Sequence, residues 1–369
     1  MLRKAPILAF LMPAVVVALV ASGGPGSVTD HMSYGPVGAK SLGAMAFGPE
    51  NVLFIGDSRG ATVYAIDLED NAYGSDAGVH VGEIDAKIAA ALGTTTDEIA
   101  INDLAVHPGS QNIYLTVTRG MGDGGEAVLV RVGHEGEIEL VSLDNIRHST
   151  AAIANPPSED QTVGRRETLA RSYTVTDLAY ADGELYVAGL SNEEFASNLR
   201  RLSFPFDGEM TSTGLEIYHV SHGQNETHAP VMTLMPQRVA GETHILAAYT
   251  CTPLVAFPVE DLADGARVFG KTVAELGAGN RPLDMVGYET DGYERILIAN
   301  SRHPLMKIDP QDLVGAPSLR SPTQETGIGF DTYEEPGVQQ LDNLNDEFVV
   351  VLIQGEEGLY LHSIAKADL

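Results

Sequence analysis

The stretch that most constrains the fold covers residues 175–204 and reads VTDLAYADGELYVAGLSNEEFASNLRRLSF. Its short apolar runs, rich in Val, Leu and Tyr, alternate with turn residues such as Asp182 and Gly183, which is typical of antiparallel strands joined by tight turns. A further run at residues 214–220 supplies a fourth strand. Four such strands bury both faces of their sheet only when similar sheets stack beside them, so the stretch predicts one unit of a repeat.

The same succession of apolar run, turn and second apolar run recurs along the chain. The repeats begin at residues 44, 103, 177, about 231, 284 and about 340. Their spacing of about 53 to 74 residues suits four-stranded blades with loop insertions. We therefore predict an all-β fold, a β-propeller of six four-stranded blades. Seven blades are the alternative, because the long insertion at residues 144–172 has room for extra strands.

The two ends of the chain are expected to close the ring. The last repeat ends with a third apolar run at residues 359–364, and the sequence stops five residues later. A propeller closes when one blade takes strands from both ends of the chain, so the run at residues 37–42 is the candidate outer strand of the last blade. The prediction is a single propeller domain over residues 34–369, preceded by a flexible segment at 23–33. One helix is expected, at residues 85–93.

The first residues have the layout of a secretory signal peptide. Arg3 and Lys4 precede an apolar stretch at about residues 7–20, and small residues follow it. The stretch is shorter than the roughly 20 residues that a membrane-spanning helix needs. We expect residues 1–22 to be removed and the mature protein to be periplasmic or secreted, without an integral membrane segment. An uncleaved anchor is the alternative.

Charge and cysteine content exclude some classes of partner and stabilisation. The formal net charge is −29, which disfavours nucleic acid and anionic membrane surfaces as partners. The single cysteine, Cys251, excludes an internal disulfide. Stability must therefore come from burial of a core, for which the chain is long enough. The oligomeric state stays open.

Repeat positions indicate which residues share one mouth of the ring. In a propeller, the innermost strands begin at the same end as the loops that follow the second strands. These two sets of positions carry Asp103, Asp177, Asp284, Arg59, Arg119, Arg302 and Asn300. Two interpretations stay open. The aspartates tie blades together by accepting hydrogen bonds from backbone amides or pairing with arginines, or the arginines make a locally positive mouth that binds a carboxylate or another oxyanion.

A second set of residues offers metal ligands. Cys251 follows the second strand of the fourth repeat, His228 precedes the inner strand of the same repeat, and His303 lies in the corresponding loop of the next. Thiolate with imidazole suits zinc or copper. His222 lies in the same approach as His228 and is a further candidate for this site.

The segment at residues 102–108, NDLAVHP, followed by IYLT at 113–116, resembles the blades of extracytoplasmic six-bladed propellers of the gluconolactonase and paraoxonase type. The resemblance covers nearly the whole mature chain, in blade pattern only. It implies a calcium ion in the central mouth that polarises a lactone or ester carbonyl. Asp103, Asp177, Asp284 and Asn300 are the positions that would hold the ion.

Three functions follow from these patterns. The first is a periplasmic or secreted propeller that binds a small anionic molecule or a protein segment at an Arg- and Asp-lined mouth. The alternatives are a calcium-dependent lactonase or esterase-like hydrolase and a copper- or zinc-binding, redox-associated protein centred on Cys251 and histidine. Whether the chain is an enzyme stays open, as does its cofactor, Ca²⁺ or a transition metal.

Overall fold

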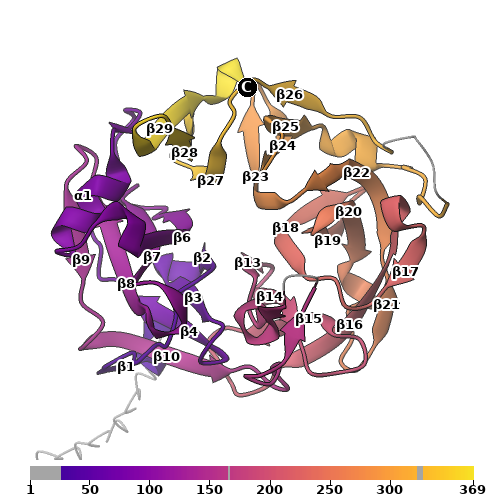
Figure 1. Ribbon diagram of the computed structural model, residues 1–369, viewed down its shortest axis with the longest axis horizontal. Coiled ribbons are helices and arrows are strands. Elements are labelled where there is room, and N and C mark those ends of the chain that lie inside the picture. The colour runs from indigo at the N-terminus through magenta and orange to yellow at the C-terminus, as the bar shows by residue number, and fades with distance from the viewer. Residues whose placement is uncertain (1–25, 165–166, 322–326) are drawn as a thin grey trace, which may run out of the picture.

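The computed structural model describes residues 26–164, 167–321 and 327–369, and within them the chain forms a six-bladed β-propeller, with the blades arranged in a ring about a central axis (Figure 1). This confirms the predicted fold class. All six inner strands begin within five residues of the predicted repeat starts. The expected signal peptide lies outside the described residues.

Each blade is an antiparallel sheet whose strands succeed one another from the channel outward. The first blade contains β2 (Met45–Phe47), β3 (Leu53–Asp57), β4 (Thr62–Asp67), β10 (Ile146–Ala152) and β1 (Ser33–Gly35). The second contains β6 (Ile99–Val106), β7 (Ile113–Arg119), β8 (Glu126–Val132) and β9 (Ile138–Val141). The third contains β13 (Asp177–Ala181), β14 (Glu184–Leu190), β15 (Ser197–Ser203) and β16 (Thr211–His219), which also pairs with β17 (Gln224–Glu226) and, in parallel, with β21 (Arg267–Phe269).

The other three blades contain four strands each. The fourth contains β18 (Val231–Val239), β19 (Glu242–Tyr249), β20 (Cys251–Pro258) and β22 (Lys271–Asn280). The fifth contains β23 (Pro282–Thr290), β24 (Tyr293–Asn300), β25 (Leu305–Ile308) and β26 (Asp331–Tyr333). The sixth contains β27 (Val338–Asn343), β28 (Phe348–Gly355), β29 (Gly358–Ala365) and β5 (His80–Val81). A small ribbon of β11 (Thr162–Val163) and β12 (Thr168–Leu169) lies within the long insertion.

The ring is closed by an N-terminal strand, as predicted, but the strand is a different one. β5 pairs antiparallel with β29 of the sixth blade. Residues 37–42 were expected there, yet they form no strand. Val37 and Leu42 are buried against Leu53 and Ile55 of the first blade, so the apolar character of this run reflects packing between blades.

The order of blades around the ring differs from their order in the sequence. The inner strand β6 of the second blade touches β2 on one side and β27 on the other, while β2 touches β13. The second blade therefore lies between the first and the sixth (Figure 1). The chain leaves the first blade after β4, adds β5 to the sixth, builds the second, and returns through β10 to complete the first. The long insertion thus supplies a blade strand that the sequence did not reveal.

Six apolar clusters lie between the blades, one at each interface. Alternation along a strand divides its side chains between two interfaces. In β19, Ile245 and Ala247 pack toward the third blade, while Leu246 and Ala248 pack toward the fifth. The predicted helix is α1 (Ile84–Ala91), whose buried Ile84 and Ile88 join the cluster between the second and sixth blades. Within the described part of the chain, no helix has the length and apolarity to cross a membrane.

Candidate functional site: the central channel

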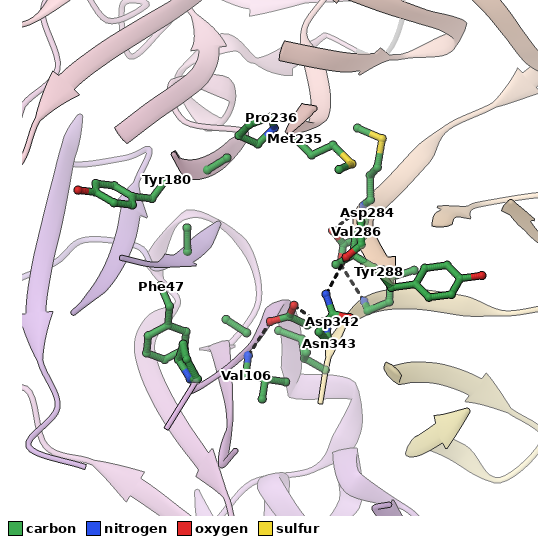
Figure 2. Close-up of a pocket in the computed structure, with 18 of the residues that line it drawn as sticks. Phe47, Val106, Tyr180, Met235, Pro236, Asp284, Val286, Tyr288, Asp342 and Asn343 are labelled. Carbon is green, nitrogen blue, oxygen red and sulfur yellow. Dashed lines mark hydrogen bonds between the residues drawn. The ribbon is translucent and has the colours of Figure 1, made fainter. Parts of the chain in front are cut away.

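The inner strands surround a cavity of about 830 Å³ along the axis of the ring (Figure 2). At one end of it lie the aspartates near the beginnings of the inner strands. The other end lies where these strands turn back into the second strands, and we call this end of the ring the hairpin face. Pro108, Glu289 and Asp346 line the cavity there, and all three are exposed.

Three of the predicted aspartates tie neighbouring blades together. Asp103 Oδ2 accepts a hydrogen bond from the Met45 N–H of the first blade at 2.6 Å. In the same way Asp177 accepts from the Leu234 N–H at 2.6 Å and Asp284 from the Leu341 N–H at 2.8 Å. Asp177 and Asp284 also accept the N–H of their own next residue. The interpretation that these carboxylates join blades through backbone amides is confirmed.

A fourth aspartate, Asp342, belongs to the same ring and was not predicted. Its Oδ2 accepts from the Val106 N–H at 2.8 Å, which links the sixth blade to the second (Figure 2). The repeat pattern of the sequence placed Gln340 in this slot. Gln340 does occupy the position of Asp103 and Asp284, since each of the three follows a bulge in its inner strand. Asp342 lies two residues further along, within the apolar run, where the repeat pattern gives no reason to expect a carboxylate.

The two remaining interfaces use other polar groups. Between the first and third blades, Ser58 Oγ donates to the Val175 carbonyl at 2.8 Å and accepts the Val175 N–H at 3.0 Å. Between the fourth and fifth blades, Gln237 Nε2 donates to Glu294 Oε2 at 3.0 Å. Each pair of neighbouring blades is therefore joined by at least one side-chain hydrogen bond.

Burial makes these carboxylates weaker acids than usual. It raises the pKa of Asp177 to about 6, against the opposing effect of the Leu234 and Leu178 N–H donors. Burial likewise raises the pKa of Asp342 to about 6. For Asp103 and Asp284, burial and the negative charges of the facing aspartates together raise the pKa well above its ordinary range. Protein surrounds all four groups, but each keeps part of its surface open to the channel, where water weakens the effect of burial.

The lining as a whole is acidic. Its acidic members are Asp103, Asp177, Asp284, Asp342, Glu289, Glu294 and Asp346, and its basic members are Arg238, Arg295 and Lys366. Seven acidic against three basic residues leave an excess of four negative charges when all are ionised. Phe47, Tyr180 and Tyr288 also contribute to the lining, but their rings point away from the centre of the cavity and pack in the clusters between blades (Figure 2).

The three predicted arginines do not line this cavity. Arg59 Nη1 donates to the Lys40 carbonyl at 3.1 Å, and Arg119 pairs with Glu126 at 3.4 Å. Arg302 is exposed on the fifth blade, which the sixth separates from the second. Arg59 and Arg302 follow second strands and Arg119 is the last residue of one, so they lie at the end of the ring opposite the hairpin face. Their role in binding an anion stays a prediction.

The residues implied by the calcium-site resemblance are not gathered into one cluster. Asn300 is buried, and its Oδ1 accepts from Asn280 Nδ2 at 2.6 Å. Among the described residues, one group of three or more possible metal ligands (His, Cys, Asp or Glu) has its ligand atoms within 4.8 Å of one another. Asp103, Asp177 and Asp284 do not belong to this group.

The predicted transition-metal ligands are also spread out where the structure describes them. His228 is exposed in the segment before β18, and His303 lies half-buried against Gly277 of β22. Neither belongs to the group of ligating side chains that lie within 4.8 Å of one another. Cys251 begins β20, and its side chain lies outside the part of the chain that the structure describes.

The fold and channel define this chain as a six-bladed β-propeller, and comparisons with known proteins add no family to that. No family model matches the chain, and no curated protein does. Similar solved structures include a putative glucose dehydrogenase from Thermus thermophilus (14% identity, 90% of this chain and 100% of that one, TM-score 0.36). They also include the PQQ-bound aldose sugar dehydrogenase from Streptomyces coelicolor (11%, 90% and 98%, TM-score 0.32) and YCF48 from Cyanidioschyzon merolae (10%, 90% and 98%, TM-score 0.36). At these scores the similarities assign neither family nor activity.

Proposed function

We propose that this protein is an extracytoplasmic binding propeller whose central channel takes a small cationic ligand of the amine class. The observation that carries the proposal is the ring of four channel-facing carboxylates within an acidic lining. A bound cation would offset both the mutual repulsion and the burial of these groups.

The carboxylates retain capacity to bind a ligand. An ionised carboxylate offers about four acceptor sites. In Asp177, Asp284 and Asp342 the backbone amides occupy two of them, one on each oxygen. Because each side chain is partly open to the channel, ammonium groups can reach the remaining acceptor sites.

The basic residues of the lining are already engaged with the protein. Arg238 Nη2 donates to the Gly241 carbonyl at 2.8 Å, Arg295 pairs with Asp309 at 3.3 Å, and Lys366 Nζ donates to the Asn345 carbonyl at 2.7 Å. Burial lowers the pKa of Lys366, which weakens its compensating charge. The channel therefore disfavours the small anion that the sequence led us to expect, unless that anion binds at the opposite end near the arginines.

Calorimetric titration of tag-free mature protein tests the proposal, with spermidine, citrate and sucrose as cationic, anionic and neutral probes. We expect one spermidine per chain at low ionic strength, with an affinity that falls as NaCl is added because salt screens the charges. Two exposed lining carboxylates can be neutralised without disturbing the ring, in the double variant Glu289→Gln with Asp346→Asn. At about 0.2 to 1 kcal/mol for each exposed pair, spermidine affinity should fall between about twofold and thirtyfold.

A charge-matched control separates the channel from the general acidity of the protein. Glu135→Gln with Glu209→Gln removes the same charge from exposed positions outside the channel, and spermidine affinity should then stay within about twofold of wild type. Equal losses in both double variants would refute a channel site. Citrate binding that Arg302→Ala weakens by about 1.5–3 kcal/mol, with no spermidine binding, would favour the anion site instead.

The extracytoplasmic location is part of the proposal and has its own test. Full-length protein expressed in a Gram-negative host should appear in the periplasm with an N-terminus close to residue 23. Retention of residues 1–22 in a membrane fraction would favour the uncleaved anchor.

A further inference from the structure

A tight hairpin on the outer side of the third blade gathers three metal-ligating side chains from eight consecutive residues. β16 ends at His219, the 3-10 turn η6 (Val220–His222) follows, and β17 returns as far as Glu226. The pairing of Ile217 with Glu226 and of His219 with Gln224 sets the register. Gly223 caps the turn at φ 66°, a left-handed conformation that glycine adopts without strain.

Both imidazoles face the same carboxylate. The Nδ1 atom of His219 lies 2.9 Å from Glu226 Oε2, and that of His222 lies 2.6 Å from Glu226 Oε1. The two ring centroids are 3.7 Å apart. One ligand atom from each of the three side chains lies within 4.8 Å of the others, and in the described parts of the chain this is the one group of its kind.

The surroundings hold the carboxylate in place and leave one side of the cluster open. His219 is 1% exposed and Glu226 is 7% exposed, whereas the His222 side chain is 44% exposed. Gln224 Nε2 donates to Glu226 Oε1 at 3.1 Å. Glu275, itself nearly buried, accepts the Val220 N–H at 3.2 Å and anchors the turn. The cluster thus has two fixed ligands and a third at the solvent boundary.

We propose that His219, His222 and Glu226 bind one divalent first-row transition ion of the Zn²⁺ type. Two imidazoles and one carboxylate are ligands that zinc accepts, and three protein ligands beside solvent leave a coordination position for water. Ligand atoms around a tetrahedral zinc ion lie about 3.3 Å apart, so the two Nδ1–carboxylate distances of 2.9 and 2.6 Å need to lengthen by less than about 1 Å to admit it. Both histidines would then ligate through Nδ1 and carry their proton on Nε2.

This site differs from the set expected from the sequence. His222 was a candidate there, but His219 and Glu226 were not, and His228 stands outside the cluster although it follows Glu226 by two residues. None of the three ligands lines the central channel, so metal binding here and ligand binding there are separable. His228 gives a matched control, because it is an exposed histidine on the same segment.

Zinc titration of tag-free protein stripped with EDTA tests the proposal, with a chromophoric chelator as competitor and elemental analysis for stoichiometry. Wild type should bind one equivalent. His222→Ala and Glu226→Gln should each weaken zinc binding at least tenfold, since even outer-sphere partners of a metal contribute about 10–100-fold, whereas His228→Ala should leave it unchanged. His222 is at the surface, so its replacement is expected to fold, which unchanged circular dichroism would verify.

Substitution with Co²⁺ adds a readout of geometry. A wild-type complex should show visible d–d absorption that His222→Ala removes and His228→Ala retains. Absence of equimolar zinc at micromolar concentration would overturn the proposal and leave the cluster as hydrogen bonding alone. Zinc binding that is lost with His228→Ala but kept with His222→Ala would overturn it in favour of the ligand set expected from the sequence.

Discussion

Replacement of Asp177 by asparagine should change both the stability of the protein and the way in which that stability depends on pH. Asp177 is the simplest member of the ring, because burial alone raises its pKa to about 6, with no neighbouring charge among the causes. A carboxyl group whose folded pKa exceeds its unfolded value of about 3.9 favours folding below pH 4 and loses that contribution as pH rises through 6. The carboxylate therefore opposes folding at neutral pH.

The size of the effect follows from the two pKa values. Between pH 4.5 and 7.5, the shift from about 3.9 to about 6 lowers the free energy of unfolding of the wild type by about 2 kcal/mol. That value is an upper bound, because part of the side chain is open to channel water. Asparagine cannot ionise and keeps one amide acceptor, but it leaves one of the two backbone N–H groups without its partner, at a cost of about 1–3 kcal/mol at every pH.

Urea unfolding of Asp177→Asn and wild type at several pH values between 4.5 and 7.5 measures this difference. The variant should be less stable at pH 4.5, and its deficit should shrink by about 1–2 kcal/mol by pH 7.5. Asp291→Asn, in an exposed hairpin of the fifth blade, is the control and should give a constant difference. A deficit for Asp177→Asn that is the same at all pH values would refute the proposed role of the buried carboxylate.

Two further predictions test the path of the chain. Asp70, in the segment that crosses from the first blade to the sixth, accepts hydrogen bonds from Ser110, Asn112 and Tyr114 of the second blade at 2.7–2.8 Å. In chemical denaturation at pH 7, Asp70→Ala should lower the free energy of unfolding by about 3–5 kcal/mol, because three largely buried donors lose their acceptor. Although burial acts to raise the pKa of Asp70, these hydrogen bonds hold it at about 2. The loss of stability in Asp70→Ala should therefore diminish as pH falls from 4 toward 2. A loss of stability below about 1 kcal/mol at pH 7 would contradict these hydrogen bonds. In Gly189→Ala the added Cβ would overlap the Thr174 carbonyl oxygen. Thermal unfolding should therefore show a destabilisation of about 1–3 kcal/mol from overpacking. Wild-type stability of this variant would mean that Thr174 does not approach β14 so closely.

Much of the fold could be predicted because each blade repeats the same local pattern. The turn at Asp182 and Gly183 and the alternation in β14 identify a hairpin without tertiary information. The order of blades could not be predicted, because the repeat pattern does not say which blades are neighbours, and the chain visits the sixth blade through β5 before it builds the second. β5 contains only His80 and Val81, which are too few residues to show a strand pattern. The apolar run at 37–42 resembles a strand because Val37 and Leu42 are buried between blades.

The site was predicted in part, and its omissions have physical causes. Asp103, Asp177 and Asp284 follow from their place before an apolar run, whereas Asp342 lies within such a run, two residues after the equivalent position that Gln340 occupies. The charge of the mouth was harder to predict, because the arginines share a repeat position but do not line the cavity, whose lining is acidic. His219 and Glu226 carried a signal that was available, since the spacing His-x2-His-x3-Glu matches a short hairpin, but a carboxylate within an acidic sequence does not stand out.

The pH dependence of spermidine binding tests the central claim about the channel most directly. The ligand binds the ionised carboxylates, and burial raises the pKa of Asp177 and Asp342 to about 6. Calorimetry at constant ionic strength should therefore show the affinity for spermidine rising from pH 5 to pH 7.5, with protons released on binding near pH 6. An affinity that is independent of pH over this range, or one that falls while citrate binding strengthens, would contradict a cation site formed by these aspartates.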